Sequence, residues 1–300
     1  IKFLFLIFKH NIKYIIKKYF HISIITALCL VNFFIWYSVY WENRGDILTV
    51  AFMDVGQGDS IFIEAPNGNT IIVDGGPSRA ILSELGKLLP FYHRSIDMLI
   101  VTNPDKDHFS GFIDVLKNYK VGEVIESGTY SDTAIYKELE KTIFDKKIPK
   151  KIAYRGMKII LDEEYKIYLY ILFPDRDVSQ WSSNDGSIVA KLVYGNISYL
   201  LMGDATKKTE NIVMNNESPN ILKSDILKIG HHGSKTSSGY DFVKAVSPFY
   251  AIISAGFHNR YGHPNKETLD TLSKLNIPAL ITFKLGTIVT ESDGVVVTVK

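Results

Sequence analysis

The distribution of hydrophobic residues divides the chain into one long apolar run and a mixed region that follows it. Residues 19–41 read YFHISIITALCLVNFFIWYSVYW and contain no Asp, Glu, Lys or Arg. A run of this length is sufficient for a helix across the ~30 Å hydrocarbon core of a bilayer. Beyond residue 46, short apolar runs alternate with Gly, Asn and Asp, which is typical of a folded domain. The pattern predicts a transmembrane helix over 19–41 and a separate domain over 47–300.

Polar and aromatic residues around the apolar run indicate its orientation. Lysines are concentrated in the N-terminal arm, residues 1–18, so the positive-inside rule places the arm in the cytoplasm. The large domain is then expected on the outer face, in a single-pass protein of the cell membrane. A cleaved signal peptide is the competing interpretation, but the run is long and lacks an A-x-A-like exit site. Aromatic residues suited to the two membrane interfaces flank the run: Tyr19, Phe20, Trp36, Tyr37, Tyr40 and Trp41.

The region 47–300 has the pattern of a layered α/β domain. ILTVAFMDV, SIFIEA and TIIVDGG read as a β-meander, and IDMLIVT reads as a buried strand between the helical patterns ILSELGKLL and FIDVLKNY. Strands KIYLYILF, SIVAKLVYG and ISYLLMGD come next. The end alternates strands DILKIG and YAIISAG with helices YDFVKAV and ETLDTLSKL, before the hairpin GTIVTESDGVVVTV. Two groups of strands with interspersed helices predict a two-sheet sandwich with helices outside.

Composition and charge narrow the classes of function. The values of 46% hydrophobic and 22% charged residues argue against a disordered chain and against a polytopic membrane protein. Cys29 is the single cysteine, which excludes an intramolecular disulfide framework and a cysteine-rich zinc site. The net charge is +2, of which residues 1–46 carry +4, leaving −2 for residues 47–300. The domain therefore lacks the basic field of a tight nucleic-acid binder, although a local patch remains compatible with it.

The richest chemical motif lies where the strand IDMLIVT ends and the following helix begins. Asn103, Asp105, Asp107 and His108 offer three oxygen donors and one imidazole within six residues. Ligands commonly bind at such carboxyl ends of strands, and a tight turn brings these donors toward one or two cations. The alternative is structural, because Asn-Pro-Asp is also a good turn and helix N-cap sequence.

Further candidate ligands also stand at the ends of apolar strands. Asp204 follows YLLMG, the pair His231 and His232 follows DILKIG, and His263 lies in NRYGHP. Each has an ordinary structural alternative, such as an N-cap or a turn, but a histidine pair before a small-residue loop is uncommon. Four such positions at strand ends together favour a metal site.

Six motifs in this order and spacing carry a family resemblance: DVGQGDS, VDGG, NPDKDH, LLMGD, GHHGS and YGHP. Together they resemble the metallo-β-lactamase superfamily, and specifically the C-terminal domain of the ComEC-type competence proteins. The resemblance covers nearly all of residues 47–300 and implies an αββα four-layer sandwich.

The resemblance also implies a set of metal ligands. The superfamily motif HxHxDH, often HxDxDH in ComEC-like proteins, falls on Asn103, Asp105, Asp107 and His108. By the same resemblance Asp204 bridges two metal sites and His231 is the late histidine ligand. The acid in the DGG turn, Asp74, resembles a residue that orients neighbouring ligands.

This sequence departs from the family pattern in two places. Asn103 replaces the first histidine of the motif, and the segment around Asn184 and Asp185 has no histidine where many relatives place a ligand. The remaining hard oxygen donors favour a manganese-like ion, or one metal in place of two zincs. The same departures are compatible with a domain that has lost catalysis and only binds its ligand.

The predicted activity is hydrolysis by metal-activated water, because no protein nucleophile motif is present. The predicted catalytic residues are Asp107, His232, His263 and Lys235; the last three, with Ser234, would contact phosphate oxygens or protonate the leaving group. A solvated loop is the alternative for Ser234 and Lys235.

By resemblance, the protein is a membrane-anchored phosphodiesterase or nuclease acting on DNA, with single-stranded DNA as partner, in competence-type uptake. One transmembrane helix cannot form a DNA channel, so an upstream or separate channel-forming membrane protein is also expected. Two alternatives remain open: a surface phosphoesterase for lipid or cell-wall phosphates, and a catalytically degenerate binding domain.

Overall fold

The computed structural model describes residues 2–42 and 45–300, with side chains described for 18–38 and 45–300. The side chains of Lys9, Lys13, Lys17, Tyr40 and Trp41, on which part of the predicted topology rests, lie outside the described residues. The chain divides into two compact units, Ile1–Gly45 and Asp46–Lys300.

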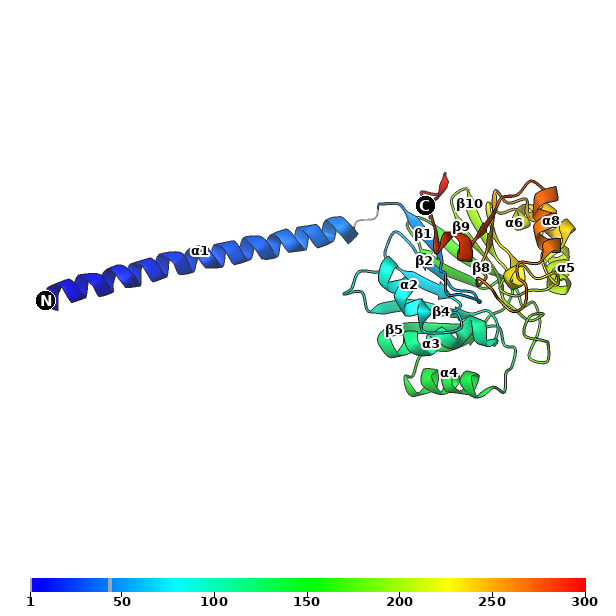
Figure 1. Ribbon diagram of the computed structural model, residues 1–300, viewed down its shortest axis with the longest axis horizontal. Coiled ribbons are helices and arrows are strands. Elements are labelled where there is room, and N and C mark those ends of the chain that lie inside the picture. The colour runs from blue at the N-terminus through cyan, green and yellow to red at the C-terminus, as the bar shows by residue number, and fades with distance from the viewer. Residues whose placement is uncertain (1, 43–44) are drawn as a thin grey trace. The chain divides into compact units, whose positions relative to one another are not determined.

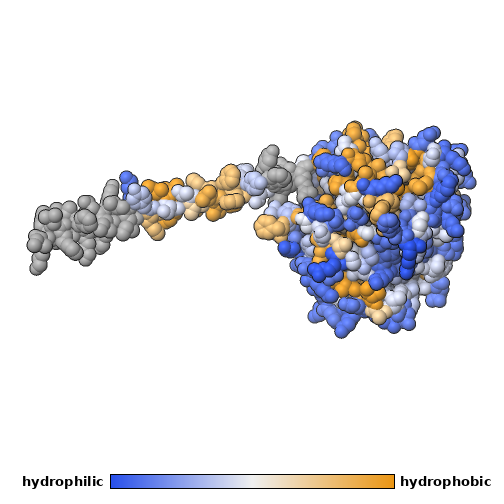
Figure 2. Space-filling model, in the orientation of Figure 1, coloured by the Kyte–Doolittle hydropathy of each residue, from blue (hydrophilic) through white to orange (hydrophobic). Residues whose placement is uncertain are grey.

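The first unit consists of helix α1 (Lys2–Glu42), which contains the predicted transmembrane segment. Its stretch Lys18–Ser38 has a mean hydropathy of 1.8 and is long and apolar enough to cross a membrane. None of this stretch is buried, and Figure 2 shows hydrophobic residues along the visible face of the helix. An exposed apolar surface of this extent is expected to contact lipid or another protein rather than water.

The second unit contains two mixed β-sheets packed face to face between helices (Figure 1). In spatial order the first sheet consists of β15 (Val297–Val299), β14 (Ile288–Ser292), β1 (Leu48–Phe52), β2 (Ile61–Glu64), β3 (Thr70–Val73), β4 (Ser95–Val101), β5 (Lys120–Glu126) and β6 (Lys150–Ile152). The second consists of β13 (Ala279–Ile281), β12 (Tyr250–Ile253), β11 (Ile226–Lys228), β10 (Ile197–Leu201), β9 (Val189–Tyr194), β8 (Ile167–Phe173) and β7 (Lys158–Asp162).

Helices cover the outer faces of both sheets. Figure 1 shows the first group beside the first sheet: α2 (Ala80–Leu88), α3 (Lys106–Asn118) and α4 (Ala134–Asp145). The group that follows β10 consists of α5 (Lys207–Asn216), α6 (Pro219–Leu222), the 3₁₀ turn η1 (Gly230–Gly233), α7 (Tyr240–Val246), α8 (Lys266–Lys274) and α9 (Thr282–Leu285). The predicted αββα four-layer sandwich is confirmed.

Central strands are apolar on both sides because each side faces a different core. In β1, Val50 and Phe52 enter the core between the two sheets, whereas Ala51 enters the core beneath α2 and α3. Burial on both faces explains why this strand reads as a continuous apolar run rather than as an alternating one.

Two loops at the carboxyl ends of strands are packed against the N-terminal half of α3. A Cβ at Gly111 would lie 2.1 Å from the Gly75 carbonyl oxygen, and one at Gly58 would lie 2.3 Å from the Asp107 carbonyl oxygen. Only glycine permits this approach of backbone to backbone. These contacts fix the first turn of α3 against the loops that follow β1 and β3.

Candidate metal centre

The first turn of α3 places Asp107 and His108 at the end of strand β4. His108 is fully buried, and its Nδ1 lies 2.7 Å from Oδ2 of Asp74. Asp74 is fixed in turn by Thr102, whose backbone N–H and hydroxyl donate to its carboxylate at 2.8 and 2.6 Å. Asp74 therefore lies where an acid that orients His108 is expected, and the Nε2 atom of His108 is left for a ligand.

Asp204 follows strand β10 and brings a carboxylate from the second sheet to the same point. Its Oδ2 lies 3.0 Å from His108 Nε2 and 3.8 Å from His231 Nε2, and its Oδ1 lies 3.5 Å from His232 Nε2. Burial raises the pKa of Asp204, but His108 and His232 outweigh burial and hold the pKa well below its usual range. Asp204 is therefore the carboxylate at the centre of the cluster.

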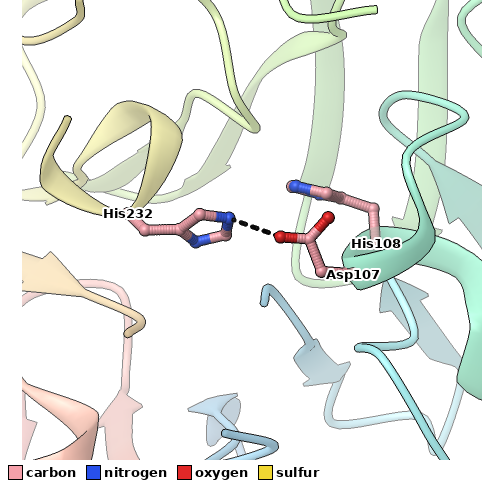
Figure 3. A group of neighbouring side chains, drawn as sticks. All are labelled: Asp107, His108 and His232. Atoms are coloured by element: carbon pink, nitrogen blue, oxygen red, sulfur yellow. Dashed lines mark ion pairs between the residues drawn. The ribbon is translucent and has the colours of Figure 1, made fainter. Parts of the chain in front are cut away.

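The pair His231 and His232 occupies the turn η1 with left-handed backbone angles, φ 48° and 54°. Such angles are uncommon for residues other than glycine and cluster at functional sites. His232 is buried and directs Nε2 to within 3.3 Å of Asp107 Oδ2, as Figure 3 shows, whereas the His231 side chain is 23% exposed. His231 was the predicted ligand, but His232 lies closer to the carboxylates of Asp107 and Asp204.

Two buried charged residues that the sequence motifs did not single out, Asp59 and Lys228, hold His232 in place. Asp59 is buried, and its Oδ1 lies 3.1 Å from His232 Nδ1, which is also 3.0 Å from the Ser254 carbonyl oxygen. Lys228 is fully buried on β11 and donates from Nζ to Asp59 Oδ2 at 2.6 Å. Asp59 stands in the motif DVGQGDS, so its place at a strand start in that motif was an available signal.

Asn103 and Asp105, the first two residues of the predicted metal motif, form hydrogen bonds within the protein. Asn103 is fully buried; its Oδ1 accepts from the Asp105 backbone N–H at 2.9 Å, and its Nδ2 lies 3.4 Å from Ser187 Oγ. Asp105 accepts from the Ser183 hydroxyl at 2.7 Å. Asn103 thus shapes the turn as an Asx contact, in keeping with the structural alternative for this sequence.

The remaining predicted residues differ in their distance from the centre. The His263 ring lies 5.5 Å from that of His231 and 6.2 Å from that of His232, between ring centroids. Partial burial and the neighbouring histidines lower the pKa of His263 to about 4, so its imidazole is neutral at physiological pH. Lys235 is exposed and does not line the central cavity, so it does not join the cluster in this structure.

The donor atoms at the centre fit a divalent cation. Among the described residues, His108 Nε2, His232 Nε2 and Asp204 Oδ1 are buried without a hydrogen-bond partner. Donor atoms of Asp107, His108 and His232 lie within 4.8 Å of one another. These atoms lie 3.0–3.5 Å from oppositely charged groups without forming hydrogen bonds, and a bound cation would satisfy them. Imidazole nitrogens with carboxylate oxygens are a suitable set for such an ion.

The electrostatics of the cluster point the same way. Burial by itself lowers the pKa of His232, but the carboxylates of Asp204 and Asp59 raise it to about 10. Burial also lowers the pKa of His108, and Asp204 and Asp74 raise it well above its usual value. The carboxylates around the two histidines therefore favour a positive charge at this point, as they would favour a bound cation.

A cavity of about 360 Å³ opens onto this cluster. The residues that line it come from both sheets and are Gln57, Pro104, Asp105, Lys106, Asp107, Ser131, Thr133, Asp204, His231, His232, Tyr261 and His263. Four predicted ligands line the cavity together with His263: Asp105, Asp107, Asp204 and His231. A substrate in the cavity would contact them.

An αββα sandwich with acids and histidines gathered at the ends of its strands is typical of metal-dependent hydrolases. Residues 53–258 match the family model described as "Metallo-beta-lactamase superfamily". The chain belongs to the metallo-β-lactamase superfamily, as its motifs predicted.

The chain is similar to three curated proteins, one of which is a competence protein by name. The chain is 34% identical over 278 residues to "ComE operon protein 3" of Bacillus subtilis (strain 168), covering 87% of this chain and 34% of that protein. It is 31% identical over 227 residues to "Recombination protein 2" of Haemophilus influenzae, covering 74% and 26%. It is 28% identical over 220 residues to "Competence protein ComA" of Neisseria gonorrhoeae, covering 72% and 28%. The chain thus spans between about a quarter and a third of the length of these relatives.

Proposed function

We propose that this protein is a membrane-anchored, metal-dependent phosphodiesterase that cleaves DNA during DNA uptake. The observation that carries the proposal is the convergence of histidine nitrogens and carboxylate oxygens from His108, His232, Asp204 and Asp107, at 3.0–3.5 Å from one another. DNA as the substrate, and a channel-forming membrane protein as the partner, rest on the competence relatives, of which this chain spans between about a quarter and a third.

We assign the cation to Asp107, His108, Asp204 and His232, with His231 beside them. A divalent ion bound there supplies a Lewis acid and lowers the pKa of bound water toward ~7. Asp74 and Asp59 hold the Nδ1 atoms of His108 and His232, so that both Nε2 atoms stay directed at the ion site. His263, as a neutral imidazole, can exchange a hydrogen bond with a substrate oxygen in the cavity.

We propose one tightly held ion in place of two, because Asn103 directs its oxygen to the Asp105 backbone. The carboxylate oxygens of Asp107 and Asp204 suit manganese, whereas the imidazoles of His108 and His232 suit zinc. The same contact favours the second candidate function, a domain that keeps the fold but only binds its ligand.

Activity of the full chain in detergent micelles tests the proposed function. With added Mn²⁺ or Zn²⁺, the protein should hydrolyse bis(4-nitrophenyl) phosphate and a single-stranded oligonucleotide; EDTA should stop both reactions and excess metal should restore them. Metal content is measured on the same samples. A folded protein that retains metal and hydrolyses neither substrate would overturn the proposal.

The variant Asn103→His separates the two candidate functions. If wild type is inactive with Mn²⁺, Zn²⁺ and Mg²⁺ but Asn103→His is active, the natural domain is a degenerate binding module. If both are active, the phosphodiesterase assignment holds.

We further propose that residues 46–300 lie on the outer face of the cell membrane. The charge difference across Lys18–Ser38 supports this orientation, because the lysines precede the apolar stretch. Protease added to intact spheroplasts should therefore degrade this domain while a cytoplasmic marker stays whole. Protection of the domain until the membrane is lysed would contradict the orientation.

A further inference from the structure

A second cavity, of about 400 Å³, adjoins the cavity of the candidate metal centre. Four residues line both cavities: Gln57, Lys106, Asp107 and Tyr261. Because Asp107 is an assigned metal ligand, a molecule that reacts at the ion can extend from it directly into the second cavity.

The chemistry of the second cavity is cationic and aromatic. Lys106 and Arg260 line it, and both are exposed. Asp107 is the only carboxylate among the described residues that line it. Tyr261 is 51% exposed, and the Arg260 guanidinium lies 4.8 Å from the centroid of its ring. Nη2 of Arg260 also donates to the Tyr261 hydroxyl at 2.6 Å, and the His263 ring stacks on Tyr261 with 5.5 Å between ring centroids. Two cations beside a half-exposed aromatic ring suit an anionic group attached to a flat ring.

The loop that carries these residues is held in shape by Asn259. Its Nδ2 donates to the carbonyl oxygens of Gly256 and His263, at 2.9 and 2.6 Å. Its Oδ1 accepts the backbone N–H groups of Tyr261 and His263, at 3.2 and 2.9 Å. The Asn259 side chain therefore fixes the positions of Tyr261 in the second cavity and of His263 in the metal cavity relative to each other.

Gln57 ties this loop to the opposite wall of the cavity. Its Oε1 accepts the Gly256 backbone N–H at 3.0 Å, and a Cβ at Gly256 would lie 2.7 Å from the Gln57 nitrogen. The loop after β12 is thus docked on the loop between β1 and β2, which reduces the entropy lost when a ligand binds.

We propose that the second cavity is a nucleotide subsite of the phosphodiesterase, which binds the unit next to the bond that is cleaved. Lys106 and Arg260 contact the adjacent phosphate, and Tyr261 stacks on its base. Stacking on an exposed ring requires an unpaired base, so the subsite selects single-stranded polynucleotide. This inference rests on the proposed function, because it takes the metal centre as the place of cleavage.

Binding without cleavage tests the subsite. Full-length protein in detergent micelles with EDTA is titrated with a fluorescein-labelled oligothymidylate, and anisotropy is followed at several salt concentrations. Arg260→Gln should weaken binding about 5- to 10-fold and reduce the slope of log affinity against log salt by about 0.7, the value for one phosphate contact on a single strand. Lys274→Gln is the matched control, because it removes one charge from an exposed position on α8 outside both cavities.

The aromatic contact has its own pair of variants. Tyr261→Ala should weaken binding about 10-fold without changing the salt slope, whereas Tyr261→Phe keeps the ring and should bind as wild type does. Equal effects of Arg260→Gln and Lys274→Gln, or tighter binding of a duplex of the same length, would overturn the subsite.

The two proposals fail separately. If the protein hydrolyses bis(4-nitrophenyl) phosphate but the Arg260 and Tyr261 variants bind oligothymidylate as wild type does, the phosphodiesterase proposal stands and the subsite proposal is wrong. If these variants lose binding but the protein hydrolyses no diester, the second cavity binds polynucleotide and the phosphodiesterase proposal is wrong.

Discussion

Replacing Asp107 with alanine is expected to reduce metal-dependent phosphodiester hydrolysis by more than ~100-fold, because loss of contacts around a metal ligand alone costs ~10–100-fold. The Asp107 carboxylate lies 3.3 Å from His232 Nε2 and lines the cavity. Its removal takes one negative charge from the ion site and weakens metal binding as well. Rates with saturating Mn²⁺ and metal content after dialysis measure the two effects.

The control for this variant is Asp114→Ala, a carboxylate further along the same helix that is absent from the cavity wall. Unfolding curves of both variants should resemble that of wild type, since Asp107 is partly exposed and lies at the helix start. Full activity of Asp107→Ala in a protein that still holds metal would contradict its assignment as a ligand.

Replacing Lys228 with methionine is expected to lower the free energy of unfolding by about 3–5 kcal/mol, the usual result of removing one partner of a buried ion pair. Lys228 and Asp59 have exposures of 0 and 1%, so the variant would leave a carboxylate buried without its cation. Urea denaturation of the full chain measures the change.

The double variant Lys228→Met with Asp59→Asn distinguishes this cause from poor packing. Neutralising Asp59 should recover part of the lost stability, because the uncompensated charge is then gone. A loss of less than ~1 kcal/mol in Lys228→Met would show that the pair is not a stabilising element. Metal affinity should fall in the double variant, since the Asp59 carboxylate also holds Nδ1 of His232.

The sequence predicted most of the fold because its central strands are long and apolar. Strands β1 to β4, β8 to β12 and the hairpin β14–β15 lie where the hydrophobic pattern placed them. The hydrophobic pattern did not predict strands β5, β6, β7 and β13. All three residues of β6 are exposed, so their place at the edge of the first sheet depends on pairing with β5 and leaves no local hydrophobic pattern.

The general position of the candidate site was also predictable, since its residues stand at strand ends. Which of His231 and His232 lies nearer the carboxylates of Asp107 and Asp204 was not predictable, because consecutive residues in left-handed backbone project in directions that no periodicity describes. Lys228 read as an ordinary strand residue. Its partner Asp59 is 169 positions away, and only the packing of the two sheets makes them neighbours.

The candidate ligands are divided between the two sheets: Asp107 and His108 follow β4 in the first, and Asp204 and His232 follow β10 and β11 in the second. A folding intermediate in which only one sheet has formed therefore holds half of the donor set. An ion bound by both halves would therefore link metal affinity to docking of the sheets, and it would act as a reversible cross-link over a chain separation of 125 positions between Asp107 and His232. Metal supply in the compartment where the chain folds would set how much of the protein population completes that docking.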